Sequence, residues 1–211
     1  MKAVIFDRDG VILDSESTNI KSAVKTFLEL GIKIKDNEKN LVIGRHPADY
    51  KEFFLKNYDF SYEKFIKIQK RIYHKLLEST PLFHKTISLI KKLHKLKIPL
   101  ALTTSAGFDS TSKVLKKSDL ENVFNVIITS ANCSKRKPDP EPYRVTAEKL
   151  NLNPVDCVAI EDSQIGVESA KNAGMKCIAL PNEYTRDQDF SRADVVVDSA
   201  DKINFELLNK L

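Results

Sequence analysis

The chain has 211 residues, of which 42% are hydrophobic and 30% are charged, and its formal net charge is +5. This length suits one core, or one core with a small accessory domain. No apolar stretch approaches the roughly 18 residues that a membrane span needs. The basic excess is modest and lacks interleaved aromatic residues, so we expect neither a nucleic-acid nor a membrane partner.

The cysteines and the first residues predict a location. Cys133, Cys157 and Cys177 form no CxxC motif and no even set, which is typical of buried thiols in a reducing compartment. The sequence begins with a strand-like segment and shows no signal-peptide pattern. We therefore expect a cytoplasmic protein, with a monomer as its simplest assembly. Its mildly positive field suits a small anionic substrate.

Short apolar runs recur along the chain and are separated by segments of helical periodicity. The runs are continuous rather than alternating, as expected of strands buried on both faces. They cover residues 3–6, 98–103, 125–129, 156–160, 176–180 and 194–197. Helices are predicted over residues 83–96, 140–151, 164–173 and 201–210. This alternation predicts an α/β fold, a doubly wound parallel sheet with helices on both faces.

Residues 15–80 interrupt this pattern with helical segments and no convincing strand. One segment carries an apolar stripe, at spacings of three and four, formed by Phe65, Ile68, Ile72 and Leu76. We therefore predict an α/β core from residues 1–14 and 81–211, with an all-helical domain, residues 15–80, inserted after the first strand. The linkers near residues 14–17 and 78–82 are the expected hinges.

Polar residues directly follow several of the predicted strands. In chain order the set is Asp7, Asp9 and Gly10 after the first strand, Thr104 and Ser105 after the second, Lys137 before a helix, and Glu161 and Asp162 after the fourth. The carboxyl ends of parallel strands face one edge of a sheet, where α/β proteins bind their ligands. Each piece alone fits a turn or a helix cap, so the prediction depends on the order and spacing of the whole set.

This set suits phosphate chemistry with a divalent cation. Carboxylates without a His or Cys cluster favour Mg²⁺ over zinc. A hydroxyl, backbone N–H groups and a lysine suit a phosphate. An aspartate beside a metal and a phosphate can act as a nucleophile and form an aspartyl-phosphate. A second carboxylate two positions on can protonate the leaving oxygen and then take a proton from water.

Together, the motifs resemble those of the haloacid dehalogenase superfamily of phosphohydrolases. They span essentially the whole chain: Phe6-Asp7-Arg8-Asp9-Gly10-Val11, Thr104-Ser105 after an apolar run, Lys137 in Lys-Pro-Asp-Pro-Glu-Pro-Tyr, and Ala159-Ile160-Glu161-Asp162-Ser163 followed by Gly166. The helical insertion is similar to the small helical cap of the family's first cap type. The resemblance implies a Rossmann-like core, a Mg²⁺ cofactor and a cap that closes over the substrate.

The resemblance also implies a role for each residue of the first two motifs. Asp7 would be the nucleophile and a metal ligand. Asp9 would be the acid/base and would lend its backbone carbonyl to the metal. Thr104 would bind the phosphoryl group, with backbone N–H groups of Ser105 and Ala106 beside it.

The later motifs supply the remaining roles. Lys137 would offset charge on the nucleophile and the phosphate. Asp162 would hold Mg²⁺, and Glu161 would bind it directly or through water. Arg45, after Gly44, resembles a substrate-phosphate contact in the cap of sugar-phosphate mutases. Arg8 departs from the family pattern, because that place is usually apolar; we expect it to turn away from Asp7 and to have a local effect only.

Asp9 helps to separate the possible activities. Dehalogenases and phosphonate-cleaving members of the superfamily lack a second aspartate, so Asp9 favours hydrolysis of a phosphate ester. A β-phosphoglucomutase-like mutase is the alternative, but Asn19 stands where such mutases have a cap histidine. A non-catalytic phospho-signalling module is remote, because the third strand ends in Thr129-Ser130 and not in a phosphoacceptor aspartate. We expect a Mg²⁺-dependent phosphatase of a small phosphorylated metabolite, such as a sugar phosphate or phosphoglycolate.

Overall fold

The computed structural model describes residues 1–39, 41–42 and 47–211. The chain divides into two compact units. Unit 1 comprises Met1–Leu13 and Leu82–Leu211, and unit 2 comprises Asp14–Pro81. Unit 2 is thus inserted into the sequence of unit 1, after the first strand and the loop that follows it.

Within the described residues, unit 1 is built on a six-stranded sheet with the order β3-β2-β1-β4-β5-β6. All neighbouring strands are parallel. The strands are β1 (Ala3–Phe6), β2 (Leu100–Thr103), β3 (Val126–Ile128), β4 (Cys157–Glu161), β5 (Lys176–Ala179) and β6 (Val195–Val196). Each falls on one of the predicted apolar runs, so the prediction of a doubly wound parallel α/β sheet is confirmed.

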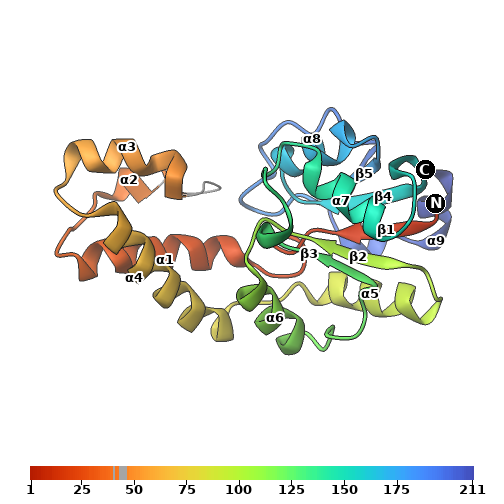
Figure 1. Cartoon of the computed structure of the whole chain (residues 1–211), viewed down its shortest axis with the longest axis horizontal. Coiled ribbons are helices and arrows are strands. Elements are labelled where there is room, and N and C mark those ends of the chain that lie inside the picture. Colours follow the sequence, from red (N-terminus) through yellow and green to blue (C-terminus); the bar gives the residue numbers. More distant parts are fainter. Residues whose placement is uncertain (40, 43–46) are drawn as a thin grey trace. The chain divides into compact units, whose positions relative to one another are not determined.

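Helices cover both faces of this sheet (Figure 1). Figure 1 shows α5 (His84–Lys95) and α6 (Phe108–Lys117) on one side, with α7 (Glu141–Lys149) and α8 (Gln164–Asn172) on the other. This arrangement follows from the strand order, because right-handed crossovers place the helices on opposite faces when the order reverses at β1.

The last helix is shorter than predicted. The sequence predicts a helix over residues 201–210, whereas α9 covers Phe205–Lys210 and a separate 3₁₀ turn covers Ala200–Lys202. The physical reason is a cap: the Asn204 side chain accepts a hydrogen bond from the Leu207 N–H at 2.9 Å and starts the helix there. Hydrophobic spacing alone did not locate that cap.

Small side chains shape the sheet face under α7 and α8. Ala3, Ala101 and Ala159 lie in one buried cluster with Tyr143 of α7. Alanines leave room for a large side chain, so Tyr143 packs inward with no exposed surface. The phenol is thereby carried beneath the carboxyl edge of the sheet.

Unit 2 is helical in the part that the structure describes. Its helices are α1 (Ser15–Glu29), α2 (Asp36–Lys39), α3 (Pro47–Asn57) and α4 (Tyr62–Leu76). Its core is aromatic, with ring centroids 4.6 Å apart for Phe27 and Phe54 and 4.7 Å apart for Phe27 and Phe65. Phe65, from the predicted stripe, is buried, as a packing role requires. Every described helix of the chain is too short or too polar to cross a membrane.

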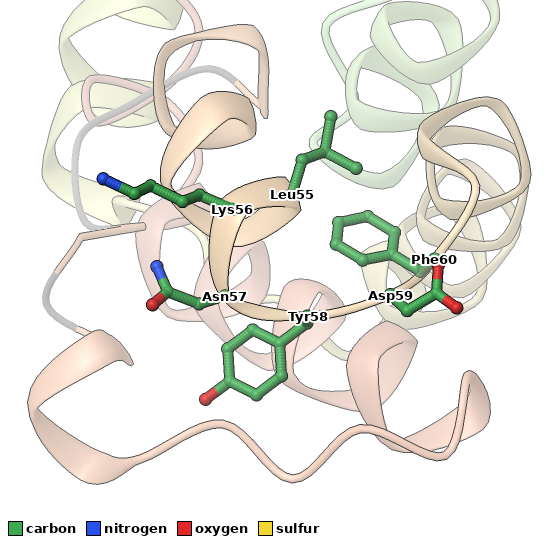
Figure 2. A pocket seen from close by; sticks show the side chains of 6 residues that line it. All are labelled: Leu55, Lys56, Asn57, Tyr58, Asp59 and Phe60. Carbon is green, nitrogen blue, oxygen red and sulfur yellow. The ribbon is translucent and has the colours of Figure 1, made fainter.

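A hollow of about 320 Å³ lies beside the turn between α3 and α4 (Figure 2). Its lining residues are Leu55, Lys56, Asn57, Tyr58, Asp59 and Phe60. The Tyr58 hydroxyl donates to Glu38 Oε2 at 2.5 Å, which ties this turn to α2. The hollow contains none of the residues predicted to react or to bind phosphate.

The two segments that connect the units run beside each other. Leu13 and Leu82 form an isolated antiparallel bridge. The Asp14 N–H donates to Pro81 O at 3.0 Å, and the Phe83 N–H donates to Ile12 O at 2.9 Å. The chain therefore leaves and re-enters unit 1 at one place.

Candidate active site

Three adjacent strands place the predicted site residues at one edge of the sheet. β1 lies between β2 and β4, with Phe6 in register with Leu102 on one side and Ile160 on the other. The residues just beyond these strand ends are therefore neighbours. The Asp7 N–H still donates to Ile160 O at 3.0 Å, so the backbone of the first motif is held against β4.

Lys137 joins the first and fourth motifs. Its ammonium donates to Asp7 Oδ1 at 2.6 Å, to Glu161 Oε1 at 2.5 Å and to the Thr103 carbonyl at 3.0 Å. All three of the charged side chains are at least nine-tenths buried. Lys137 is thus enclosed between two carboxylates that are distant from it in the sequence. It belongs to the site and is not a surface lysine.

The electrostatics of this cluster are dominated by burial and excess negative charge. Burial raises the pKa of Asp7 to about 7, with Lys137 opposing and the Glu161 and Asp9 charges adding to the rise. The pKa of Asp162 is raised well above its usual range, first by burial and then by the charge of Asp7 and other carboxylates. Burial disfavours the charge of Lys137, but Asp7 and Glu161 outweigh it and raise the pKa of the ammonium. One ammonium therefore does not satisfy this group of carboxylates.

Asp7, Glu161 and Asp162 could hold a metal ion. One carboxylate oxygen from each lies within 4.8 Å of the others, and all three residues are buried. With Lys137 these carboxylates carry a formal charge of −2, which a divalent cation balances. Oxygen donors without nitrogen or sulfur suit a hard cation such as Mg²⁺. The residues present therefore fit the predicted cofactor.

Two glycines make room for the metal-site carboxylates. A Cβ added at Gly10 would overlap the Asp162 carboxylate, and one added at Gly166 would overlap the Glu161 carboxylate. Gly10 also has a φ of +77°, in the left-handed region that favours glycine. The glycines of the first and fourth motifs thus serve the packing of the acidic residues, which explains their place in the sequence.

Asn182 and Tyr143 hold metal-site carboxylates, and the sequence reasoning gave neither a role. Asn182 Nδ2 donates to Asp162 Oδ2 at 2.8 Å and to Gly10 O at 3.4 Å. The Tyr143 hydroxyl donates to Glu161 Oε1 at 2.5 Å. Asn182 follows β5, the neighbour of β4, so a polar residue just past the fifth apolar run was the available signal. Tyr143 stood at the end of the third motif, and its burial under the sheet was the missing information.

Thr104 and Asp9 lie together on the other side of the first motif. Thr104 Oγ1 donates to Asp9 Oδ2 at 3.4 Å and accepts from the Ala106 N–H at 3.0 Å. Thr104 is buried, Ala106 is half-buried and Ser105 is exposed. Gly107, the N-cap of α6, follows, so this loop leads into a helix N-terminus, which favours anions. The loop is therefore placed as a phosphate-binding turn would be.

The Arg8 side chain reaches Asp9 and the first turn of α6. It is 2% exposed. The sequence reasoning expected a local effect only from this departure; the guanidinium in fact lies on the second aspartate of the motif. Arg45, together with Gly44, lies outside the described residues.

This fold and this edge of the sheet define an α/β protein with a buried acidic and lysine cluster suited to phosphate and a divalent cation. The chain matches the family model described as haloacid dehalogenase-like hydrolase over residues 4–180, and it belongs to that family. The predicted superfamily is thereby confirmed. The predicted enzyme class, a phosphoric monoester hydrolase, is confirmed by this match and by relatives that are named phosphatases.

Individual relatives cover most of the chain. It is 31% identical over 184 residues to the phosphorylated carbohydrates phosphatase of Thermotoga maritima, covering 84% of each chain. Among solved structures, CbbY from Rhodobacter sphaeroides in complex with phosphate superposes with a TM-score of 0.87 at 24% identity, covering 100% of both chains. β-Phosphoglucomutase from Clostridium difficile superposes with a TM-score of 0.81 at 26% identity, covering 100% of this chain and 96% of its own.

Proposed function

We propose that this protein is a Mg²⁺-dependent phosphatase that hydrolyses a small phosphate monoester through an aspartyl-phosphate on Asp7. The observation that carries the proposal is the buried cluster in which Lys137 bonds both Asp7 and Glu161, with Asp162 beside them. Its carboxylates outnumber its one ammonium, which suits a cation and a phosphoryl group together. A purely structural ion pair has no use for the additional buried carboxylate.

In the first step Asp7 attacks. A carboxylate oxygen of Asp7 forms a bond to phosphorus, and the bond from phosphorus to the ester oxygen breaks. Asp9 gives its proton to the departing oxygen, so the alcohol leaves neutral. Thr104 and the backbone N–H groups beside it orient the phosphoryl oxygens, and Lys137 holds Asp7 in place.

In the second step water regenerates the enzyme. Asp9, now a carboxylate, takes a proton from water as the water oxygen bonds to phosphorus. The bond between phosphorus and Asp7 breaks, inorganic phosphate leaves, and Asp7 is again a free carboxylate. Asp9 recovers its proton in the same step, so the pair returns to its starting state.

Asp7, Asp162 and Glu161 would hold Mg²⁺, with the backbone carbonyl of Asp9 as a further ligand. When bound, the cation neutralises the charge that develops on the phosphoryl oxygens. Asn182 and Tyr143 keep two of the ligands oriented through their hydrogen bonds. Gly10 and Gly166 provide the space in which those carboxylates lie.

The substrate class we propose is a phosphorylated carbohydrate or a similarly small phosphorylated metabolite. The relative from Thermotoga maritima is named for phosphorylated carbohydrates. We assign unit 2 the role of a cap that chooses the leaving group and excludes water from the site, with the linkers near residues 14–17 and 78–82 as its hinges. Arg45 is the candidate for a substrate-phosphate contact in that cap.

A sugar-phosphate mutase is the second candidate, favoured by the likeness to β-phosphoglucomutase. Such an enzyme would return the phosphoryl group to a sugar hydroxyl instead of releasing it. Asn19 of α1, in place of the histidine of such mutases, favours the phosphatase. Free phosphate that accumulates from a single sugar phosphate supports the phosphatase; isomerised sugar phosphate without free phosphate supports the mutase.

The test is phosphate release from a panel of sugar phosphates and p-nitrophenyl phosphate. Asp7→Asn should abolish release while the circular dichroism spectrum stays unchanged. Asp119→Asn, the same substitution at an exposed residue of unit 1, serves as the matched control. EDTA should stop the wild-type reaction, and Mg²⁺ should restore it. Turnover that survives in Asp7→Asn would refute the nucleophile, and turnover that survives in EDTA would refute the metal requirement.

A further inference from the structure

Arg8 is a buried arginine beside the second aspartate of the first motif, with 2% of its side chain exposed. Its guanidinium meets the Asp9 carboxylate edge to edge: NH2 lies 2.8 Å from both carboxylate oxygens, and Nε lies 3.1 Å from Oδ2. This geometry fixes the carboxylate more firmly than a single contact would. The Asp9 side chain itself is one-third exposed, so one part of it still reaches solvent.

A second set of contacts anchors the guanidinium to α6. Arg8 NH1 donates to Ser110 Oγ at 3.0 Å and to Thr111 Oγ1 at 3.4 Å. Both hydroxyls in turn donate to the Gly107 carbonyl, at 3.0 and 2.9 Å. The guanidinium therefore cannot move relative to Asp9 without breaking its hydrogen bonds to the first turn of α6.

These bonds link Asp9 with the phosphate-binding turn at two points. Thr104 Oγ1 donates directly to Asp9 Oδ2, and Arg8 connects Asp9 with α6, whose N-cap is Gly107. The loop from Thr104 to Gly107 is thus tied to the carboxylate at both ends. Burying an arginine is costly unless its charge is paired and its N–H groups are bonded. Both conditions are met here by contacts that also orient Asp9.

We propose that Arg8 is a positioning residue for the acid/base: it holds the Asp9 carboxylate at a fixed place relative to the turn that receives the phosphoryl group. The proposal rests on the role of Asp9 in the proposed function. Proton transfer needs the donor oxygen within hydrogen-bond reach of the leaving oxygen, and small displacements are costly in rate. Without Arg8 the carboxylate of Asp9 can turn out of that position.

The measurable consequence is a dependence on the leaving group. Phenyl phosphate and p-nitrophenyl phosphate have similar shapes, but phenolate is a poor leaving group that needs a proton and p-nitrophenolate is a good one that scarcely does. For the phosphoryl-transfer step, Arg8→Met should therefore lower kcat/KM for phenyl phosphate about tenfold more than for p-nitrophenyl phosphate. Arg192→Met, at an exposed arginine of unit 1, should change neither.

Asp9→Asn, measured with the same two substrates, separates the two proposals. If Asp9→Asn shows no leaving-group dependence, the acid role of Asp9 is wrong and the role of Arg8 is wrong with it. Suppose instead that Asp9→Asn shows the leaving-group dependence while Arg8→Met lowers kcat/KM equally for both substrates, or for neither. In that case only the role of Arg8 is wrong. The double variant Arg8→Met/Asp9→Asn should have the same kcat/KM for phenyl phosphate as Asp9→Asn alone, because Arg8 acts only through Asp9.

Two milder variants keep the proposal testable if Arg8→Met does not fold. Ser110→Ala retains both members of the ion pair and removes one anchor, so it should lower kcat/KM for phenyl phosphate about twofold to threefold more than for p-nitrophenyl phosphate. Arg8→Lys keeps the charge but not the edge-to-edge geometry, and it should fall between wild type and Arg8→Met. Equal effects on the two substrates in both variants would overturn the proposal.

Discussion

Replacing Gly10 with alanine is expected to weaken metal binding beyond any effect on folding. At the φ of +77° an L residue costs roughly 1–2 kcal/mol of stability. The added Cβ would also overlap the Asp162 carboxylate, which must then shift. Because Asp162 is a proposed ligand and is held by Asn182, the shift should disturb the metal site directly.

Gly174→Ala is the matched control in the same unit. Gly174 has a φ of +89°, so alanine there meets a similar backbone strain. Its added Cβ would meet the Pro154 side chain at 3.9 Å, which is an ordinary van der Waals contact. The two variants therefore share the strain of the left-handed backbone, and only Gly10→Ala displaces a carboxylate.

Urea unfolding and a Mg²⁺ titration of activity read out the two effects. Both variants should lose about 1–2 kcal/mol of unfolding free energy from backbone strain, with a further loss in Gly10→Ala from the overlap. Gly10→Ala should raise the Mg²⁺ concentration for half-maximal phosphatase activity about tenfold or more, and Gly174→Ala should leave it unchanged. A Mg²⁺ requirement in Gly10→Ala equal to that of wild type, or equally altered in both variants, would refute the reasoning.

Three further predictions concern the buried network and one charged residue outside it. Lys137→Met leaves the carboxylates of Asp7 and Glu161 without their ammonium, and it should cost about 3–5 kcal/mol of unfolding free energy in urea. Tyr143→Phe removes one hydrogen bond to Glu161, and it should cost about 1–3 kcal/mol and raise the Mg²⁺ requirement. Burial disfavours the charge of Asp194, but hydrogen bonds from Lys171, the Cys177 N–H and Lys176 lower its pKa. Its stabilising contribution is therefore present above the unfolded pKa of about 3.9 and is lost as the pH falls through the lower folded pKa. The difference in unfolding free energy between wild type and Asp194→Asn should accordingly be largest at neutral pH and should disappear in acid.

Each of these three has its own contrary outcome. If Lys137→Met is as stable as wild type, the ammonium of Lys137 does not compensate the charge of the buried carboxylates. A Mg²⁺ requirement unchanged in Tyr143→Phe would mean that the phenol supports packing and not the orientation of Glu161. A stability difference for Asp194→Asn that stays as large in acid as at neutral pH would show that its cause is not the carboxylate charge.

The fold was largely predictable because the sheet strands are nearly pure apolar runs. Strands buried on both faces cannot alternate, so their composition marks them, and the helices between them follow the helical period. The end of the chain was less predictable. The start of α9 depends on a single cap at Asn204, and hydrophobic spacing does not contain that information.

The site was predictable where it stands at strand ends and less so where tertiary packing supplies it. Asp7, Glu161 and Asp162 follow apolar runs directly, and a parallel sheet must bring such ends together. Tyr143 reaches the same cluster from the inner face of α7, through space that small alanines leave open. The contacts of Arg8 with α6 join residues about a hundred positions apart, and local sequence did not indicate that pairing.

The central position of β1 bears on how the chain is made. β1 pairs with β2 and β4, whose residues are translated roughly 100 and 150 positions later. At ribosomal rates of about 5–20 residues per second, this strand waits on the order of ten seconds or more for its second partner. Asp7 and Asp9 are therefore made on the order of 150 residues before Glu161 and Asp162 and can meet them only after β4 has been translated. A nascent chain that stops before β4 has one edge of β1 unpaired and lacks the carboxylates of Glu161 and Asp162, so chaperones have a long interval in which to bind it.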